Sequence, residues 1–254
     1  MVKKRIIPVQ LLWGGRLVKT RAFGTPRDVG DPIASSRVYN AQNADELICL
    51  NIDRSERTIT PLLEILDRVS RVCFMPLSLG GGIRTFDDAA RLIKGGADKV
   101  VVNSAAYEDP DLIGRIAGTY GRQAIVVAID VRREATLDSV VLYSDCGRVA
   151  QRVRLKDHVA NIIQHGAGEI LIQSIDRDGT MQGYDIPLIS AVCMQCGVPV
   201  IASGGAGHYN HLREAFLETA VSALACGSLF NFGDSNPIRA KAFLSNSGLK
   251  FKVV

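Results

Sequence analysis

The sequence predicts an α/β fold, a closed (β/α)8 TIM barrel made of two similar half-barrels. Three observations favour it: eight short apolar segments alternate with amphipathic ones, parts of the chain repeat at one offset, and 254 residues is a typical length for one such barrel. The alternation runs without a Pro-, Gly- or Ser-rich linker, so we expect a single domain over residues 1–254. Its half-barrels would span about residues 1–122 and 123–254.

The apolar segments are rich in β-branched residues and are apolar almost throughout, which is typical of parallel strands covered on their outer face. We expect strands at 5–11, 46–52, 75–80, 98–103, 124–130, 169–175, 199–203 and 221–226. The stretches between them predict helices near 31–42, 58–70, 85–95, 108–118, 153–165, 185–196, 208–219 and 236–246.

The repeat supports two half-barrels of four units each. Residues 46–54 match residues 169–177 at an offset of 123, and residues 76–82 match residues 199–205 at the same offset. At this offset Asn103 and Ser104 fall one residue short of Gly227 and Ser228. Agreement over separate segments makes coincidence a poor explanation.

Composition narrows the class of function. Apolar residues make up 47% and charged residues 22%, which is ordinary for a soluble globular enzyme. The net charge of +4 suits an anionic ligand but forms no basic stripe, so nucleic-acid binding is not expected. The apolar runs fall short of the ~18 residues of a membrane span, and the N-terminus reads as a strand instead of a signal peptide. We therefore expect a cytoplasmic protein without a membrane partner.

Neither a metal nor a cofactor is expected. The six cysteines lie in core-like segments of a long chain, which indicates free thiols in a reducing compartment. Cys193 and Cys196 form a lone C-x-x-C without a second pair, and His208 and His211 lack an acidic partner motif.

Glycines at strand ends predict phosphate binding. Gly81 and Gly82 follow one strand and precede a helix, so backbone N–H groups and the helix N-terminus can hold an anion. Asn103 and Ser104, after the next strand, can add an amide and a hydroxyl donor.

The second half repeats this arrangement with Gly204 and Gly205, followed by Gly227 and Ser228. The loops after the seventh and eighth strands of such barrels are a recurrent phosphate site. The alternative is that the glycines only form tight turns. Two symmetric pairs favour a ligand that carries phosphate at both ends and lies across the barrel mouth.

Taken together, residues 98–104, 127–130, 174–180 and 201–206 resemble the cyclase subunit of imidazole glycerol phosphate synthase, and the resemblance runs from Arg5 to about Phe230. It implies a glutaminase subunit docked on the N-terminal face of the barrel as a heterodimer partner. Ammonia from that subunit would cross the barrel and attack a bisphosphorylated substrate at the opposite face. The products would be imidazole glycerol phosphate, for histidine biosynthesis, and an aminoimidazole carboxamide ribotide.

The resemblance also assigns residues to roles. Arg5, Glu46, Lys99 and Glu169 match the charged ammonia gate of the family, one at the start of each of four strands. An ordinary cluster of salt bridges is the alternative, although an apolar barrel bottom would be less costly.

Further matches concern the partner and the phosphates. Asp98 and Gln123 match contacts to the glutaminase. Lys19, Phe23 and Arg27 match the mobile loop after the first strand, with Lys19 as a ligand contact. Asp178 and Gly179, in the stretch 174–180, complete the implied phosphate and substrate contacts.

One departure from the family pattern concerns catalysis. The family uses two carboxylates as general acid and base, at the ends of the first and fifth strands. Asp130 supplies the second, but Leu11 occupies the position of the first and transfers no proton. Asn51 stands where the family usually has Asp, and Asp53 nearby is a candidate replacement.

These departures resemble a divergent branch associated with surface sugars, in O-antigen or flagellar glycans. The leading hypothesis is a lyase-type barrel subunit that uses ammonia from a glutaminase, binds a phosphorylated small molecule and acts in acetamidino-sugar formation. A sugar amidotransferase would be a further partner. One alternative is an active cyclase of histidine biosynthesis. Another is a non-catalytic activator of the glutaminase that conducts ammonia. The related sugar isomerase ranks lower because it also needs the first-strand carboxylate and has no need of the charged gate.

Overall fold

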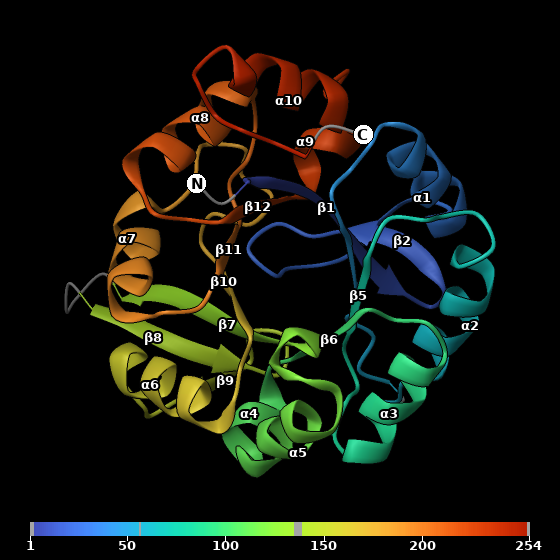
Figure 1. Cartoon of the computed structure of the whole chain (residues 1–254), viewed down its shortest axis with the longest axis vertical. Helices are drawn as coiled ribbons and strands as arrows, with labels where there is room; N and C mark the ends of the chain where they lie inside the picture. Colours follow the sequence, from blue (N-terminus) through green and yellow to red (C-terminus); the bar gives the residue numbers. More distant parts are fainter. Residues whose placement is uncertain (1–2, 56, 135–138, 253–254) are drawn as a thin grey trace.

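The computed structural model describes residues 3–55, 57–134 and 139–252 and confirms the predicted (β/α)8 barrel (Figure 1). Eight parallel strands run around the barrel in chain order, and pairing of the fifth with the sixth, Asp130 beside Gln173, completes the closed sheet. The strands are β1 (Arg5–Trp13), β4 (Leu47–Asn51), β5 (Leu77–Gly80), β6 (Lys99–Val102), β7 (Ile125–Glu134), β10 (Glu169–Ser174), β11 (Val200–Ser203) and β12 (Ala223–Cys226).

Helices surround the barrel and agree with the predicted ranges to within three residues. Side-chain caps explain several of the helix starts. Thr85 and Asp88 form a capping box, in which each side chain accepts a hydrogen bond from the backbone N–H of the other. The helices are α1 (Pro32–Ala41), α2 (Thr60–Val69), α3 (Phe86–Lys94), α5 (Asp111–Tyr120), α6 (Leu155–His165), α7 (Ile186–Gln195), α8 (Tyr209–Glu218) and α10 (Pro237–Ser245).

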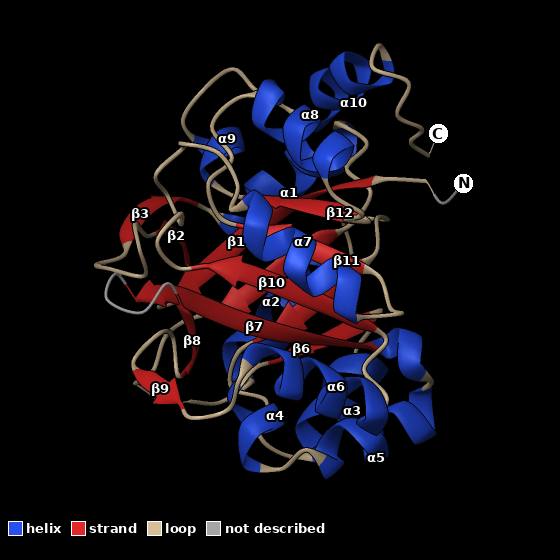
Figure 2. Cartoon of the chain, turned by 90° about the vertical axis from the view of Figure 1, so that its left-hand side faces the viewer, coloured by secondary structure: helices blue, strands red, loops and turns tan. Residues whose placement is uncertain are grey.

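The segment after the first strand, expected to be a long loop, contains two short strands. β1 continues to Trp13 and turns back at Gly14 and Gly15, both at positive φ, to pair with β2 (Arg16–Lys19) and through it β3 (Arg27–Gly30). Lys19 and Arg27 therefore lie on strands. β7 likewise extends into an antiparallel sheet with β8 (Ser139–Ser144) and β9 (Val149–Gln151). Figure 2 shows these additions at one end of the barrel and both termini at the other.

Three short elements also lie outside the predicted set. Two are the helices that follow β6 and β12, and the third is a 3-10 turn before β7. They are α4 (Ser104–Glu108), α9 (Ser228–Asn231) and η1 (Arg122–Ala124).

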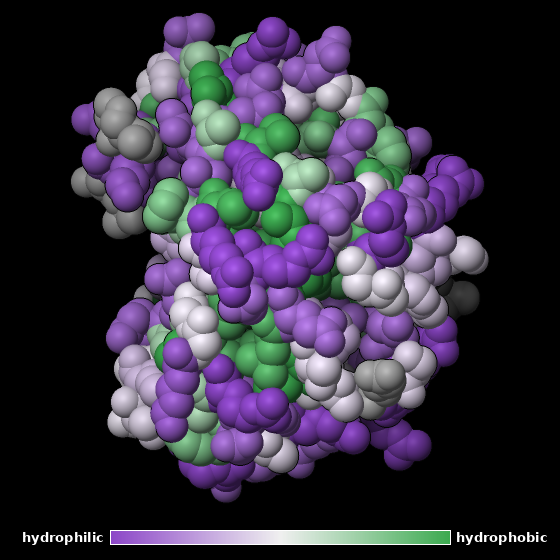
Figure 3. Space-filling view, turned by 90° about the vertical axis from the view of Figure 1, so that its right-hand side faces the viewer, coloured by the Kyte–Doolittle hydropathy of each residue, from purple (hydrophilic) through white to green (hydrophobic). Residues whose placement is uncertain are grey.

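Side chains of each strand alternate between the lumen and the helices, as the period of two requires. On β1, Ile6 and Leu12 pack with the large outer core, whereas Ile7, Val9 and Leu11 join a separate cluster inside the barrel. That lumen cluster also contains Val18, Ile48, Val101, Val126, Ala128, Leu171, Ile201, Ala223 and Ala225. On the face shown in Figure 3, hydrophilic side chains surround and partly cover smaller apolar patches. In the part of the chain that the structure describes, no helix combines the length and apolar character that crossing a membrane requires.

Candidate functional site

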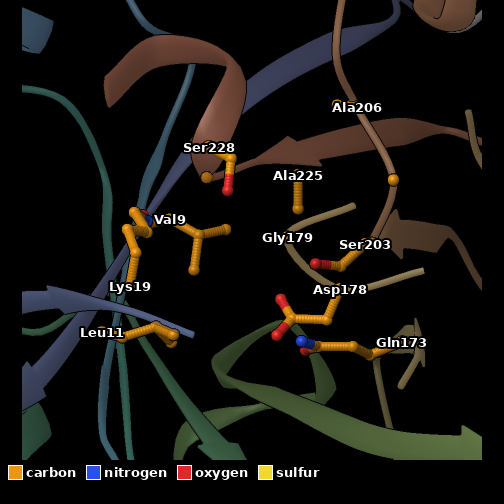
Figure 4. A pocket seen from close by; sticks show the side chains of 13 residues that line it. Val9, Leu11, Lys19, Gln173, Asp178, Gly179, Ser203, Ala206, Ala225 and Ser228 are labelled. Atoms are coloured by element: carbon orange, nitrogen blue, oxygen red, sulfur yellow. The ribbon is translucent and has the colours of Figure 1, made fainter. Parts of the chain in front are cut away.

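Two hollows open at the C-terminal ends of the barrel strands. The larger has a volume of about 870 Å³ and includes Gly81, Gly82, Asn103 and Ser104 in its wall, together with Asp130. The smaller, about 30 Å³, is lined by the four residues predicted for the second phosphate, Gly204, Gly205, Gly227 and Ser228 (Figure 4). Three residues expected as further ligand contacts also line it: Lys19, Asp178 and Gly179. Each predicted phosphate group therefore gathers in a hollow of its own.

All four glycines of the two pairs have positive φ. Gly81 and Gly82 have φ of +94° and +80°, and Gly204 and Gly205 have +98° and +104°. A Cβ on Gly82 would lie 2.4 Å from the carbonyl oxygen of Thr58. These positions require glycine for two reasons: the backbone has positive φ, and another backbone segment of the same protein approaches closely.

The residues after β6 and β12 are also equivalent, but at an offset of 124 instead of 123. Asn103 precedes α4 with φ −127° and ψ −79°, and Gly227 precedes α9 with φ −102° and ψ −82°. Ser104 and Ser228 each begin the short helix that follows. One extra residue in the second half therefore accounts for the slip seen in the sequence.

Asp130 lines the larger hollow and is 8% exposed. Burial, and then repulsion from Asp178, raise the pKa of Asp130 to about 7. Asn103 Nδ2 donates to Asp130 Oδ2 at 3.2 Å and to the carbonyl oxygen of Ala128 at 3.1 Å. A carboxyl group with this pKa can give or take a proton near neutral pH.

Leu11 is 8% exposed and lines both hollows, so the position expected for the first carboxylate does face the mouth. Asn51 is buried and accepts a hydrogen bond from the backbone N–H of Asp53. Asp53 lines the larger hollow, but its oxygens accept from Ser55 and from the N–H of Gly14, and these bonds lower its pKa. Asp53 is thus held in a local turn as an ionised group.

Lys19 and Asp178 dominate the smaller hollow. Lys19 Nζ donates to the carbonyl oxygen of Val9 at 2.6 Å, and burial lowers the pKa of Lys19 to about 8 despite the opposing effect of Asp178. Asp178 accepts from Thr20 Oγ1 at 2.7 Å and from the N–H of Phe23 at 3.3 Å. The segment between β2 and β3 is thereby bonded to the opposite side of the mouth.

At the other end of the barrel, four charged side chains form a closed ring of ion pairs, which we call the charged ring (Arg5, Glu46, Lys99, Glu169). Arg5 lies 2.8 Å from Glu46 and 2.8 Å from Glu169. Lys99 Nζ lies 2.9 Å from Glu46 and 2.8 Å from Glu169. The four side chains are between 2% and 22% exposed, so the ring is largely removed from water.

Asp98 and Gln123 lie at the same end of the barrel, before β6 and β7, and both are exposed. Asp98 also has a structural task, because its carboxylate accepts a hydrogen bond of 2.8 Å from the N–H of Leu77 at the start of β5. Gln123 donates to the carbonyl oxygen of Tyr120.

Sequence reasoning missed Tyr107, in the wall of the larger hollow, and His158, which packs against it. Among the described residues, three buried polar atoms lack a hydrogen-bond partner: Asn103 Oδ1, Tyr107 Oη and His158 Nε2. The rings of Tyr107 and His158 are stacked with centroids 4.1 Å apart, and burial lowers the pKa of His158 to about 4. The sequence offered no periodic or motif signal for this pair. The described residues contain no group of three or more His, Cys, Asp or Glu side chains arranged to hold a metal ion.

Comparison with known proteins places this geometry in context. Residues 5–236 match the family model described as "Histidine biosynthesis protein". The chain is 44% identical over 254 residues to the imidazole glycerol phosphate synthase subunit HisF of Hyphomonas neptunium, with all of both chains covered. It is 43% identical over 253 residues to the same subunit of Caulobacter vibrioides, covering 100% of this chain and 97% of the relative.

Proposed function

Since this chain belongs to the histidine biosynthesis protein family, we propose that it is the barrel subunit of a glutamine amidotransferase, which accepts ammonia from a glutaminase and uses it at the barrel mouth. The acceptor is a phosphorylated small molecule that spans the two hollows. Asp130 is the group that exchanges protons with it.

The charged ring is the observation that carries this proposal. Placing charges in a barrel interior is costly, and well-packed apolar residues would give equal or greater stability there. Glu46 nevertheless accepts from both Arg5 and Lys99 at one end of an otherwise apolar lumen. A function that depends on charge at this place explains the arrangement better than stability does.

A ring above an apolar lumen suits the passage of neutral ammonia. Ammonium and other ions would lose their hydration inside the barrel, at a cost of several kcal/mol per ion after relaxation. Neutral ammonia avoids that cost. Movement of one side chain of the ring, such as Lys99, would open a path from the N-terminal face toward Asp130.

The nature of the acceptor depends on Leu11. Without a second carboxylate at this position, ring closure of the bisphosphate substrate loses half of an acid–base pair, whereas ammonia supply does not. This favours a role beside a glutaminase and a sugar amidotransferase in acetamidino-sugar formation for surface polysaccharide.

A second function is supported by other observations. The relatives are named as subunits of imidazole glycerol phosphate synthase, and both glycine pairs that we expect to bind phosphate have positive φ. These two observations favour a working cyclase of histidine biosynthesis, in which another group replaces the missing carboxylate. Ammonia-dependent turnover of the bisphosphate substrate separates the two functions.

The proposal is tested through its partner. The purified chain should bind a glutaminase subunit from the same organism through the face around Asp98 and Gln123, and should increase its hydrolysis of glutamine. Gln123→Arg, which adds bulk and charge to that exposed face, should weaken both effects. If no such glutaminase binds, or if binding leaves glutamine hydrolysis unchanged, the proposed function is wrong.

A further inference from the structure

Arginines gather on one wall of the larger hollow. Arg54 grips Asp145 with two guanidinium nitrogens, and Arg57 Nη2 lies 3.1 Å from the same carboxylate. Burial would raise the pKa of Asp145, but the hydrogen bond from Arg54 and the charges of Arg54, Arg57 and Arg148 lower it overall. Three cations thus surround one anion, which leaves a local excess of positive charge.

The excess is local, because carboxylates also line the hollow. Asp53 and Glu108 contribute negative charge elsewhere on the wall, and Arg84 adds positive charge. Asp130, with a pKa of about 7, is only partly ionised at neutral pH. The uneven distribution therefore favours anions beside Asp145 and not over the hollow as a whole.

The arginine cluster adjoins the first phosphate loop. The backbone N–H of Asp145 donates to Ser104 Oγ at 3.1 Å, and Ser104, the first residue of α4, lines the same hollow as Gly82. The serine hydroxyl keeps its own proton to donate. An anion on the loop and an anion on the arginines would therefore be close neighbours.

The hollow also has room for a larger molecule than a phosphate. Its volume of about 870 Å³ lies in the range of sites for organic ligands, roughly 300–1,000 Å³. Trp13 and Ile83 provide apolar surface in its wall. Asn103 Oδ1 and Tyr107 Oη, both buried in the wall and lacking partners among the described residues, are polar groups that a ligand can satisfy.

We propose that the larger hollow binds a diphosphate-bearing small molecule, with one phosphate on Gly82 and Ser104 and the adjoining phosphate on Arg54, Arg57 and Arg148. Arginine is suited to this task because its planar fork pairs with two phosphate oxygens at once. Asp145 holds Arg54 and Arg57 in place until the ligand binds. The inference deepens the proposed function, on which it rests for the role of the bound molecule as ammonia acceptor.

Inorganic pyrophosphate and inorganic phosphate are the probes, titrated calorimetrically into the full chain at constant pH and ionic strength. Pyrophosphate should bind at least about tenfold more tightly than phosphate, as one extra charge-assisted contact predicts. Arg148→Gln should remove about that factor for pyrophosphate and leave phosphate affinity nearly unchanged. Asp145→Asn, which removes the competing carboxylate, should instead tighten pyrophosphate binding.

Arg152→Gln is the matched control, because Arg152 is an exposed arginine four residues further along and is not in the wall of the hollow. It should bind both probes like the parent chain. Equal affinity for the two probes, or an equal loss in Arg148→Gln and Arg152→Gln, would overturn the proposal. The titration contains neither glutaminase nor ammonia, so its failure would leave ammonia delivery to a phosphate monoester standing. Conversely, a failure to activate the glutaminase would count against the proposed function and not against binding of a diphosphate.

Discussion

Glu46 and Glu169 occupy equivalent places in the two halves of the barrel, 123 residues apart, and each accepts from both Arg5 and Lys99. The internal repeat thus supplies the two anions of the charged ring, one from each half, whereas Arg5 and Lys99 both come from the first half, from β1 and β6. Each cation bridges the halves. Loss of either cation would leave the two carboxylates sharing the one cation that remains.

Lys99→Ala should disturb the passage of ammonia while leaving the acceptor site intact. In a complex with glutaminase, the fraction of glutamine-derived ammonia that reaches the acceptor should change, because the charged ring loses the two ion pairs that Lys99 makes. Free ammonium at raised pH should remain usable. The measurement is the ratio of product formed to glutamine hydrolysed.

Lys94→Ala, at the exposed last residue of α3 and five residues before Lys99, is the control for the loss of a lysine. An unchanged ratio in Lys99→Ala would contradict a role of the ring in ammonia passage and would favour an ordinary structural cluster.

Much of the barrel could be predicted from the sequence because the relevant signals are local. The strands and helices follow from short-range patterns, and a closed parallel sheet then places all strand starts at one end. This is why Arg5 and Glu169, far apart in the chain, could be expected to lie close together. The glycine pairs were visible because positive φ leaves few alternatives to glycine.

What the sequence did not predict depends on contacts without a local pattern. Arg54 and Asp145 are 91 residues apart, and they meet only because the turn after β8 folds over the mouth. The hairpins at the mouth are short strands without a core of their own, so hydrophobic periodicity does not reveal them. The bond from Asn103 to Asp130 depends on the register of β6 against β7, which the sequence alone does not fix.

Anion binding in the smaller hollow should weaken as the pH rises through about 8. Lys19 is charged below this pH and neutral above it, because burial lowers its pKa to about 8. Sulfate is the suitable probe, since its charge stays constant between pH 6 and 9.5 (roughly the range used for such titrations). Lys19→Met should bind sulfate weakly and without this pH dependence. A parent affinity that is flat across the range would contradict a role for Lys19.

Asp130→Asn should stabilise the protein at neutral and alkaline pH. The folded state raises the pKa of Asp130 from 3.8 to about 7, so the parent chain loses stability as the pH rises from about 4 to about 7. The variant lacks this loss. Its advantage should be absent near pH 3, grow to at most roughly 4 kcal/mol at pH 7, and stay level above. Urea unfolding at several pH values measures it, and a pH-independent difference would contradict the raised pKa.

Leu11→Asp tests whether the first strand lacks only its carboxylate. The parent chain should show little ammonia-dependent ring closure of the bisphosphate substrate, because acid–base groups typically contribute about 10²–10⁴-fold to a rate. Leu11 faces the mouth and lines the same hollow as Asp130, so an aspartate there should restore part of that factor. Leu11→Asn is the matched control, since asparagine has nearly the same shape and polarity as aspartate but does not act as a general acid or base. A rate gain in Leu11→Asp alone would identify the carboxylate as the missing group. Equal rates in both variants and in the parent, with ligand binding preserved, would indicate a site adapted to another acceptor, and a parent chain that already turns over rapidly would show that Leu11 does not limit ring closure.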